Sequence, residues 1–215
     1  MNRHDLAYVS PAAWRTLLRT HAELAEDPTV ASWADRDWPL VRRRANPGEW
    51  QGVPLGLPLP PSAGKKRLAF LVPAEDIVAV VPSPSMVFAS RAAPPSWRPT
   101  LLRLGQFAAQ QGAEARVFGS LAWQAITGLD YLTGRSDLDF TLHVHRNTQL
   151  RPLADELARM EADAPMRLDG ELIRGDGCAV NWRELHGGAC ELLVKTVAGV
   201  TLLDTGQFLS GRVPA

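Results

Sequence analysis

Residues 116–140 read RVFGSLAWQAITGLDYLTGRSDLDF. Apolar residues dominate 115–118, which predicts a strand, and residues 120–127 favour a short helix that begins where this strand stops. A second strand is predicted over 138–144. The segment therefore predicts a strand–helix–strand unit, with Gly119-Ser120 at the turn from strand into helix.

The polar residues of this unit can hold an anion and a metal ion together. Helix N-terminal amides and the Ser120 hydroxyl can bind a substrate phosphate, and Gly119 lets the backbone approach it; Ser120 could also be the helix N-cap. Asp137 and Asp139 stand two residues apart at the start of the second strand, so their carboxylates share one face. Paired carboxylates suit Mg²⁺. The pattern predicts a metal-dependent phosphoryl or nucleotidyl transfer centre.

The composition excludes several other classes of protein. The chain has 215 residues, is 46% hydrophobic and carries 23 basic against 23 acidic residues, whereas a general polynucleotide or membrane-surface binder carries a basic excess. No segment reaches the ~20 apolar residues of a membrane span. Cys178 and Cys190 lack the spacing of a metal site or disulfide framework, which favours the cytoplasm. We therefore predict a globular cytoplasmic protein that binds neither nucleic acid nor membrane.

The rest of the chain predicts an α+β protein in two domains, residues 1–85 and 86–215. The proline-rich stretch 82–99 is the expected boundary or linker. We expect 52–61 to be an extended loop packed by its leucines, because prolines cannot donate to the ladder of a central strand. Elsewhere the pattern predicts strands over 4–9, 38–44, 68–72, 166–173, 179–184 and 200–203, and helices over 11–24, 98–111, 147–162 and 191–197, with another short helix beginning at Pro28.

Several short sequence motifs along the chain resemble those of a known family. Besides 116–133 and SDLD at 136–139, they are HDL at 4–6, WPLVRRR at 38–44, GVPLGLPLPP at 52–61, GKKR at 64–67, DGCAVNWRE at 176–184 and LVK at 193–195. Gly-Ser followed by Asp-x-Asp resembles the core motif of the nucleotidyltransferase superfamily. The full set resembles the phosphoribosyl-dephospho-CoA transferases, the holo-acyl-carrier-protein synthases of malonate decarboxylase. This resemblance implies a nucleotidyltransferase-like mixed-sheet domain over 86–215 and a smaller α+β domain over 1–85.

The resemblance also implies a reaction. The family transfers the 2′-(5″-phosphoribosyl)-3′-dephospho-CoA group from its triphosphoribosyl precursor to a serine of the apo acyl carrier subunit of malonate decarboxylase, with Mg²⁺ as cofactor and pyrophosphate as product. Two alternatives stay open: another Mg²⁺-dependent nucleotidyltransferase that uses ATP, and a catalytically silent module that binds a carrier. The intact Gly-Ser and Asp-x-Asp pattern argues against the silent module, which has no need of paired carboxylates.

Transfer centres of this kind need a third carboxylate on a neighbouring strand. Asp169 and Glu171 are the candidates, since they are two residues apart and share one face of the strand predicted over 166–173. Asp169 is preferred because it is shorter and more rigid, and because Gly170 beside it would let a ligand approach. We therefore predict that Asp137, Asp139 and Asp169 are catalytic and hold the metal.

Basic residues are expected to complete the substrate site. Lys65, Lys66 and Arg67 follow the proline-rich loop and are the preferred phosphate ligands, although charge runs are more often solvated surface. The run at 42–44 is a second basic cluster, and either cluster could meet phosphate or the acidic face expected of a carrier protein. Lys195 interrupts an apolar run, so we expect it to have a polar partner or to bind substrate.

Overall fold

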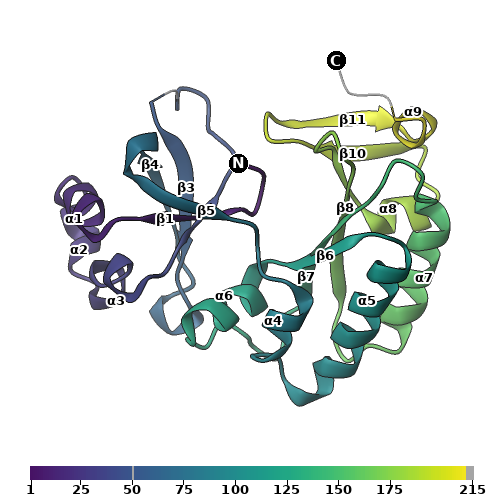
Figure 1. The fold of residues 1–215 in the computed structure, drawn as a ribbon, viewed down its shortest axis with the longest axis horizontal. Helices are drawn as coiled ribbons and strands as arrows, with labels where there is room; N and C mark the ends of the chain where they lie inside the picture. Colours follow the sequence, from purple (N-terminus) through teal and green to yellow (C-terminus); the bar gives the residue numbers. More distant parts are fainter. Residues whose placement is uncertain (50, 212–215) are drawn as a thin grey trace. The chain divides into compact units, whose positions relative to one another are not determined.

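The structure is a computed structural model that describes residues 1–49 and 51–211 (Figure 1). The chain folds into two compact units, Met1–Ser83 and Pro84–Ala215. Each unit combines a β-sheet with helices, which confirms the α+β class. Within the described residues, no helix is long and apolar enough to cross a membrane.

The N-terminal unit is an antiparallel sheet with short helices. It contains β1 (Leu6–Val9), α1 (Pro11–Arg19), α2 (Ala22–Ala25), α3 (Pro28–Ala31), η1 (Ala34–Arg36), β2 (Leu40–Arg42), β3 (Val53–Pro58), η2 (Pro61–Ala63), β4 (Arg67–Val72), η3 (Ala74–Asp76) and β5 (Ile77–Val81). The strand order is β4-β3-β2-β1-β5. Side-chain oxygens of Ser10 and Asp27 accept from backbone N–H groups at the starts of α1 and α3, as expected of N-caps.

Residues 52–61 differ from the predicted loop, because β3 is an interior strand between β2 and β4. The pairing of Val41 with Gly56 places Pro54 and Pro58 opposite positions just beyond the ends of the short strand β2. The carbonyl of Pro54 points toward β2, since it accepts from the Arg43 N–H. The Pro54 nitrogen, which has no hydrogen to donate, points the same way. Neither proline therefore removes a bond from the β2 ladder. The leucines are buried, as predicted: Leu55, Leu57 and Leu59.

The C-terminal unit is built on a mixed sheet. It contains α4 (Met86–Ser90), η4 (Pro95–Trp97), α5 (Arg98–Gln110), β6 (Glu114–Val117), α6 (Gly119–Thr127), β7 (Leu138–His143), α7 (Leu150–Ala162), β8 (Leu168–Ile173), β9 (Ala179–Asn181), α8 (Trp182–His186), β10 (Glu191–Lys195), β11 (Val200–Asp204) and α9 (Thr205–Leu209). The strand order is β11-β10-β9-β8-β7-β6. β7 and β8 run parallel, joined through α7, and the other neighbouring strands are antiparallel. A parallel pair needs such a crossover connection.

This mixed sheet has an apolar face and a polar face. Phe140, Leu172 and Val194 belong to the hydrophobic core together with leucines of α5 and α7, and both helices lie on that side of the sheet (Figure 1). Side chains alternate along a strand, so the intervening residues point to the opposite face. That polar face carries, on neighbouring strands, Arg116, Asp139, Thr141, Asp169, Glu171, Asn181 and Lys195.

The division between the two units falls at Ser83/Pro84, inside the stretch 82–99, but the rest of this stretch is structured, so it is not a linker. It forms α4 and η4, and Met86, Ala89 and Trp97 are buried in the core of the C-terminal unit. Ser85 starts α4, since its Oγ accepts from the Phe88 N–H at 3.2 Å. Pro95 begins η4 and Pro99 lies in the first turn of α5, where a helix tolerates a proline because the N–H it lacks would have no partner within the helix.

Two other predictions near the C-terminus are wrong. The helix predicted over 191–197 is absent, since Glu191–Lys195 form the strand β10, in which Leu192 and Val194 are buried while Leu193 is exposed, a period of two. The strand predicted over 179–184 ends at Asn181, whose side chain caps α8. The helix predicted over 147–162 begins only at Leu150. The helix predicted over 11–24 is divided into α1 and α2. The structure also contains β5 and α9, which the sequence patterns do not predict.

Gly170 serves packing, and the expectation that it admits a ligand is wrong. A Cβ atom there would lie 2.2 Å from Cζ of Phe140, its register partner on β7. We expect Gly170→Ala to lower the free energy of unfolding in urea by about 1–3 kcal/mol, because overpacking displaces the ring. At Gly175 a Cβ would meet nothing within 4 Å, so Gly175→Ala should change stability by less than about 0.5 kcal/mol. Equal effects of the two substitutions would contradict this packing role.

Candidate active site

Three carboxylates converge where β7 and β8 begin. Asp137 precedes β7, Asp139 lies on it, and Asp169 is the register partner of Asp139 on β8. Parallel strands in register place such residues side by side. One carboxylate oxygen of each residue lies within 4.8 Å of the others, and all three side chains are half-buried. The fold thus brings together the three acids that the sequence singled out.

Glu171, the other candidate for the third carboxylate, is engaged elsewhere. It is 5% exposed, and its Oε1 accepts from Lys195 Nζ at 2.8 Å. This pair provides the polar partner expected for Lys195. It lies on the polar face of the sheet, two residues along β8 from Asp169. Asp169, and not Glu171, joins the cluster of Asp137 and Asp139.

Gly119 lets the first turn of α6 pass close to Asp139. Its φ is +65°, a conformation that glycine adopts without strain. A Cβ atom at this position would lie 1.8 Å from Asp139 Oδ2. The Phe118 N–H donates to the Asp139 carbonyl at 3.0 Å, which ties the strand-to-helix turn to β7. No other residue type fits this position without moving the carboxylate.

Ser120 is the second residue of α6, and its possible role as the N-cap is excluded. The N-cap position belongs to Phe118, and no side chain caps the helix. Within the described residues, the Ser120 hydroxyl makes no hydrogen bond to another group of the protein. Helix N-terminal amides that lack a side-chain cap, together with a free hydroxyl, can bind an anion. The first turn of α6, which passes beside Asp139 at Gly119, therefore offers groups of the kind that can bind an anion.

A positively charged side chain, Arg183, lies near the acids, and its charge is offset by Glu161. Arg183 forms a two-pronged ion pair with Glu161 and stacks over the Trp182 ring, with its Cζ 4.5 Å from the ring centroid. The pKa of Arg183 is raised chiefly by the hydrogen bond to Glu161, and also by the charges of Asp169 and Asp137. Sequence reasoning did not single out Arg183 or Glu161, because their pairing joins α8 to α7 and no local pattern announces it.

The same ion pair predicts a pH-dependent stability. The hydrogen bond from Arg183 lowers the pKa of the Glu161 carboxyl below its usual value of 4.5. The stabilisation is therefore complete above about pH 4.5 and is lost as the pH falls through the lowered pKa. We expect Glu161→Gln to lower the free energy of unfolding by about 1–3 kcal/mol at pH 7, because Arg183 loses its anion. Urea unfolding between pH 7 and pH 3 should show this difference narrowing toward acid, and a constant difference would contradict the assignment.

The predicted basic cluster Lys65, Lys66 and Arg67 belongs to the N-terminal unit. Lys65 has a φ of +53° in the turn that follows Gly64 and leads into β4. All three side chains are exposed. Their environment is that of solvated cations, which are available to a ligand in solution.

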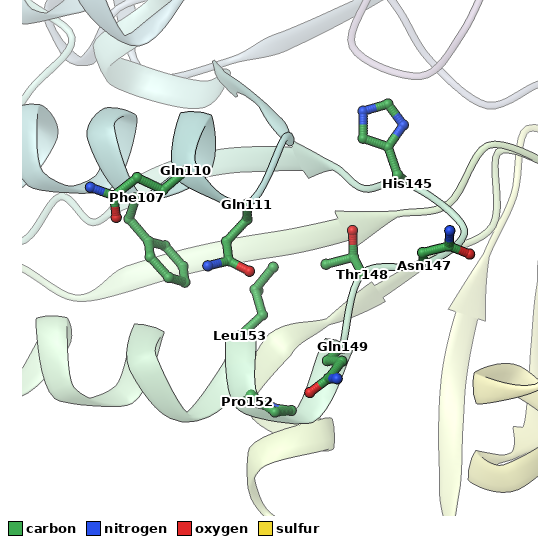
Figure 2. Close-up of a pocket in the computed structure, with 9 residues that line it drawn as sticks. All are labelled: Phe107, Gln110, Gln111, His145, Asn147, Thr148, Gln149, Pro152 and Leu153. Carbon is green, nitrogen blue, oxygen red and sulfur yellow. The ribbon is translucent and has the colours of Figure 1, made fainter.

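A pocket of about 390 Å³ opens at the other end of β7 from the acids (Figure 2). Phe107 and Gln110 line it from α5, Leu153 from α7, and His145 from the loop after β7. Its polar groups are amides, a hydroxyl and an imidazole, without the carboxylates and the lysine found on the polar face. The pocket is therefore chemically different from the acidic cluster.

The parallel β7–β8 pair, with acids at its start and a Gly-Ser helix beside it, is the arrangement of a nucleotidyltransferase-like domain. Comparisons with known families narrow this class. The family described as "Phosphoribosyl-dephospho-CoA transferase MdcG N-terminal domain" matches residues 2–83, and the corresponding C-terminal domain matches residues 85–206. The chain belongs to the phosphoribosyl-dephospho-CoA transferase family, and is accordingly a transferase.

Curated relatives agree with this family. A phosphoribosyl-dephospho-CoA transferase of Bradyrhizobium diazoefficiens is 54% identical over 209 residues, which cover 97% of this chain and 92% of the relative. Proteins of the same name from Xanthomonas campestris pv. campestris and Xanthomonas euvesicatoria pv. vesicatoria are 38% and 36% identical, each over 99% of both chains. No solved structure matches this chain significantly. The family resemblance found in the sequence is thereby confirmed.

Proposed function

We propose that this protein transfers the 2′-(5″-phosphoribosyl)-3′-dephospho-CoA group from its triphosphoribosyl precursor to a serine of the apo acyl carrier subunit of malonate decarboxylase, and releases pyrophosphate. The observation that carries this proposal is the cluster of Asp137, Asp139 and Asp169 beside Gly119 and Ser120, in a chain of this family. The cytoplasm, where thiols stay reduced, is the proposed compartment, since Cys178 and Cys190 are unpaired.

The acidic cluster fits Mg²⁺ as the cofactor. Its donors are hard carboxylate oxygens, which Mg²⁺ prefers, and they come from two adjacent strands within 4.8 Å of one another. Three negative charges this close repel each other unless a cation offsets them. We propose that Asp137, Asp139 and Asp169 hold Mg²⁺. When bound, the ion would stabilise the negative charge that develops during phosphoryl transfer.

The residues around the cluster have distinct proposed tasks. The first-turn amides of α6 and the Ser120 hydroxyl bind phosphate oxygens and hold the triphosphate for in-line attack. The carrier serine hydroxyl forms the new bond to the α-phosphorus as the bond to pyrophosphate breaks. Asp169 takes the proton of that hydroxyl.

Basic residues supply the remaining charge in this proposal. Lys195, held on the polar face by Glu171, binds a substrate phosphate. The exposed cluster Lys65, Lys66 and Arg67 of the N-terminal unit is also proposed to bind phosphate. Lysine acts in such sites as a point charge that neutralises phosphate without a demanding geometry.

Intact-mass spectrometry of the apo acyl carrier subunit tests the proposed reaction. The subunit is incubated with this protein, Mg²⁺ and triphosphoribosyl-dephospho-CoA, and in parallel with ATP in place of that substrate. We expect a mass gain equal to the phosphoribosyl-dephospho-CoA group in the first sample and none in the second. A gain the size of AMP with ATP alone would instead indicate another nucleotidyltransferase. No gain in either sample would favour a silent carrier-binding module.

A further inference from the structure

Asn181 connects the third carboxylate to the start of α8. Its Nδ2 donates to Asp169 Oδ1 at 2.9 Å, and its own Oδ1 accepts from the Arg183 N–H at 3.0 Å. Because a backbone N–H is a donor, it requires the amide oxygen on its side and turns the amide NH₂ toward Asp169. The helix cap thus sets the direction of the bond to the carboxylate.

The backbone next to Asp169 is held by the same segment. The Leu168 carbonyl accepts from Trp182 Nε1 at 2.9 Å and from Arg183 Nη2 at 3.0 Å. The Leu168 N–H donates to Glu161 Oε1 at 2.7 Å, and Glu161 is itself paired with Arg183. Trp182 is only 1% exposed, so its indole is fixed by packing. Residues 181–183 at the start of α8 therefore fix Asp169 in two ways, through a bond to its carboxylate and through bonds to the carbonyl of the preceding residue, Leu168.

We propose that Asn181 is a positioning residue for the transfer reaction. It keeps Asp169 in the rotamer that groups one of its oxygens with those of Asp137 and Asp139. Without this bond, the carboxylate would rotate away from two neighbouring negative charges. The inference rests on the proposed function, since it takes the three acids to bind a divalent cation. Hydrogen bonds that orient metal ligands typically change metal affinity or activity by about 10- to 100-fold.

The capping role of Asn181 can be separated from its bond to Asp169. Serine and asparagine are comparably good N-caps, but serine has no amide that could reach the carboxylate. Asn181→Ser therefore keeps the cap of α8 and removes the bond to Asp169. Asp204 offers a matched control, because it caps α9 through the Gln207 N–H at 3.0 Å and is not among the clustered acids.

Mn²⁺ binding to the full chain, without substrate, tests the inference. The ion is titrated into the wild-type protein, Asn181→Ser and Asp204→Ser, and free Mn²⁺ is measured by electron paramagnetic resonance. We expect the Kd to rise about 10- to 100-fold in Asn181→Ser and to stay within about twofold in Asp204→Ser. Thermal unfolding should stay unchanged within a few degrees in both variants. In transfer assays, Asn181→Ser should need more Mg²⁺ for its half-maximal rate.

The outcomes separate this inference from the proposed function. Equal Mn²⁺ affinity of wild type and Asn181→Ser would overturn the positioning role and leave the metal centre intact. An equal loss in Asp204→Ser would show that the effect does not depend on the bond to Asp169, and would also overturn the positioning role. A wild-type protein that does not bind Mn²⁺ would overturn both the metal centre and the role of Asn181.

Discussion

Asp139→Asn should reduce transfer of the prosthetic group by about 10³-fold while the protein stays folded. Asparagine keeps the size of the side chain, so the close approach of Gly119 is unchanged. It removes one negative charge from a cluster whose three acids lie within 4.8 Å. A factor of 10³ corresponds to about 4 kcal/mol of transition-state stabilisation, the scale expected when a catalytic metal site is weakened. The initial rate of mass gain on the carrier measures this effect.

Asp130→Asn is the matched control for this substitution. Asp130 lies between α6 and β7, is exposed and is not among the clustered acids. The same loss of charge there should leave the transfer rate within about twofold of wild type. If Asp139→Asn kept more than a tenth of the wild-type rate, the acidic cluster could not be the catalytic centre.

Gly119→Ala should have a comparably large effect through geometry alone. Alanine would place its Cβ 1.8 Å from Asp139 Oδ2 in a left-handed conformation. The left-handed backbone costs a non-glycine residue about 1–2 kcal/mol, and the clash must displace either the carboxylate or the start of α6. We expect transfer to fall by about 10²- to 10³-fold, together with a lower temperature of thermal unfolding.

Gly128 offers a control at the other end of the same helix. It also has a left-handed conformation, with a φ of +72°, but a Cβ there would meet nothing within 4 Å. Gly128→Ala should therefore lose about 1 kcal/mol of stability and keep its transfer rate. Loss of activity in both variants to the same extent would mean that backbone strain, and not the contact with Asp139, explains the effect.

Local patterns predicted the elements of the chain best where one physical signal dominated. The helix over 98–111 and the strands around the acids follow from apolar periodicity, and α5, β7 and β8 occupy these positions. Predictions failed where partners outside the segment decide. β3 tolerates its prolines because β2 is short, and β10 forms a strand because its neighbours β9 and β11 pair with it.

The sequence by itself determined the family, through the motifs spread along the chain, and the α+β class, through its strand and helix patterns. It also supplied the residue types of the candidate site, because Gly-Ser and Asp-x-Asp depend on short-range geometry. The sequence preferred Asp169 over Glu171 as the third acid, but one of its reasons, an open approach at Gly170, is wrong; tertiary structure decided that Asp169 completes the cluster. Asp169 and Glu171 share one face of β8, so a shift of two residues would exchange them. The register is consistent with the fit of the Phe140 ring into the space that Gly170 leaves open. That packing places Asp169 beside Asp139, and no pattern within a single strand contains this information.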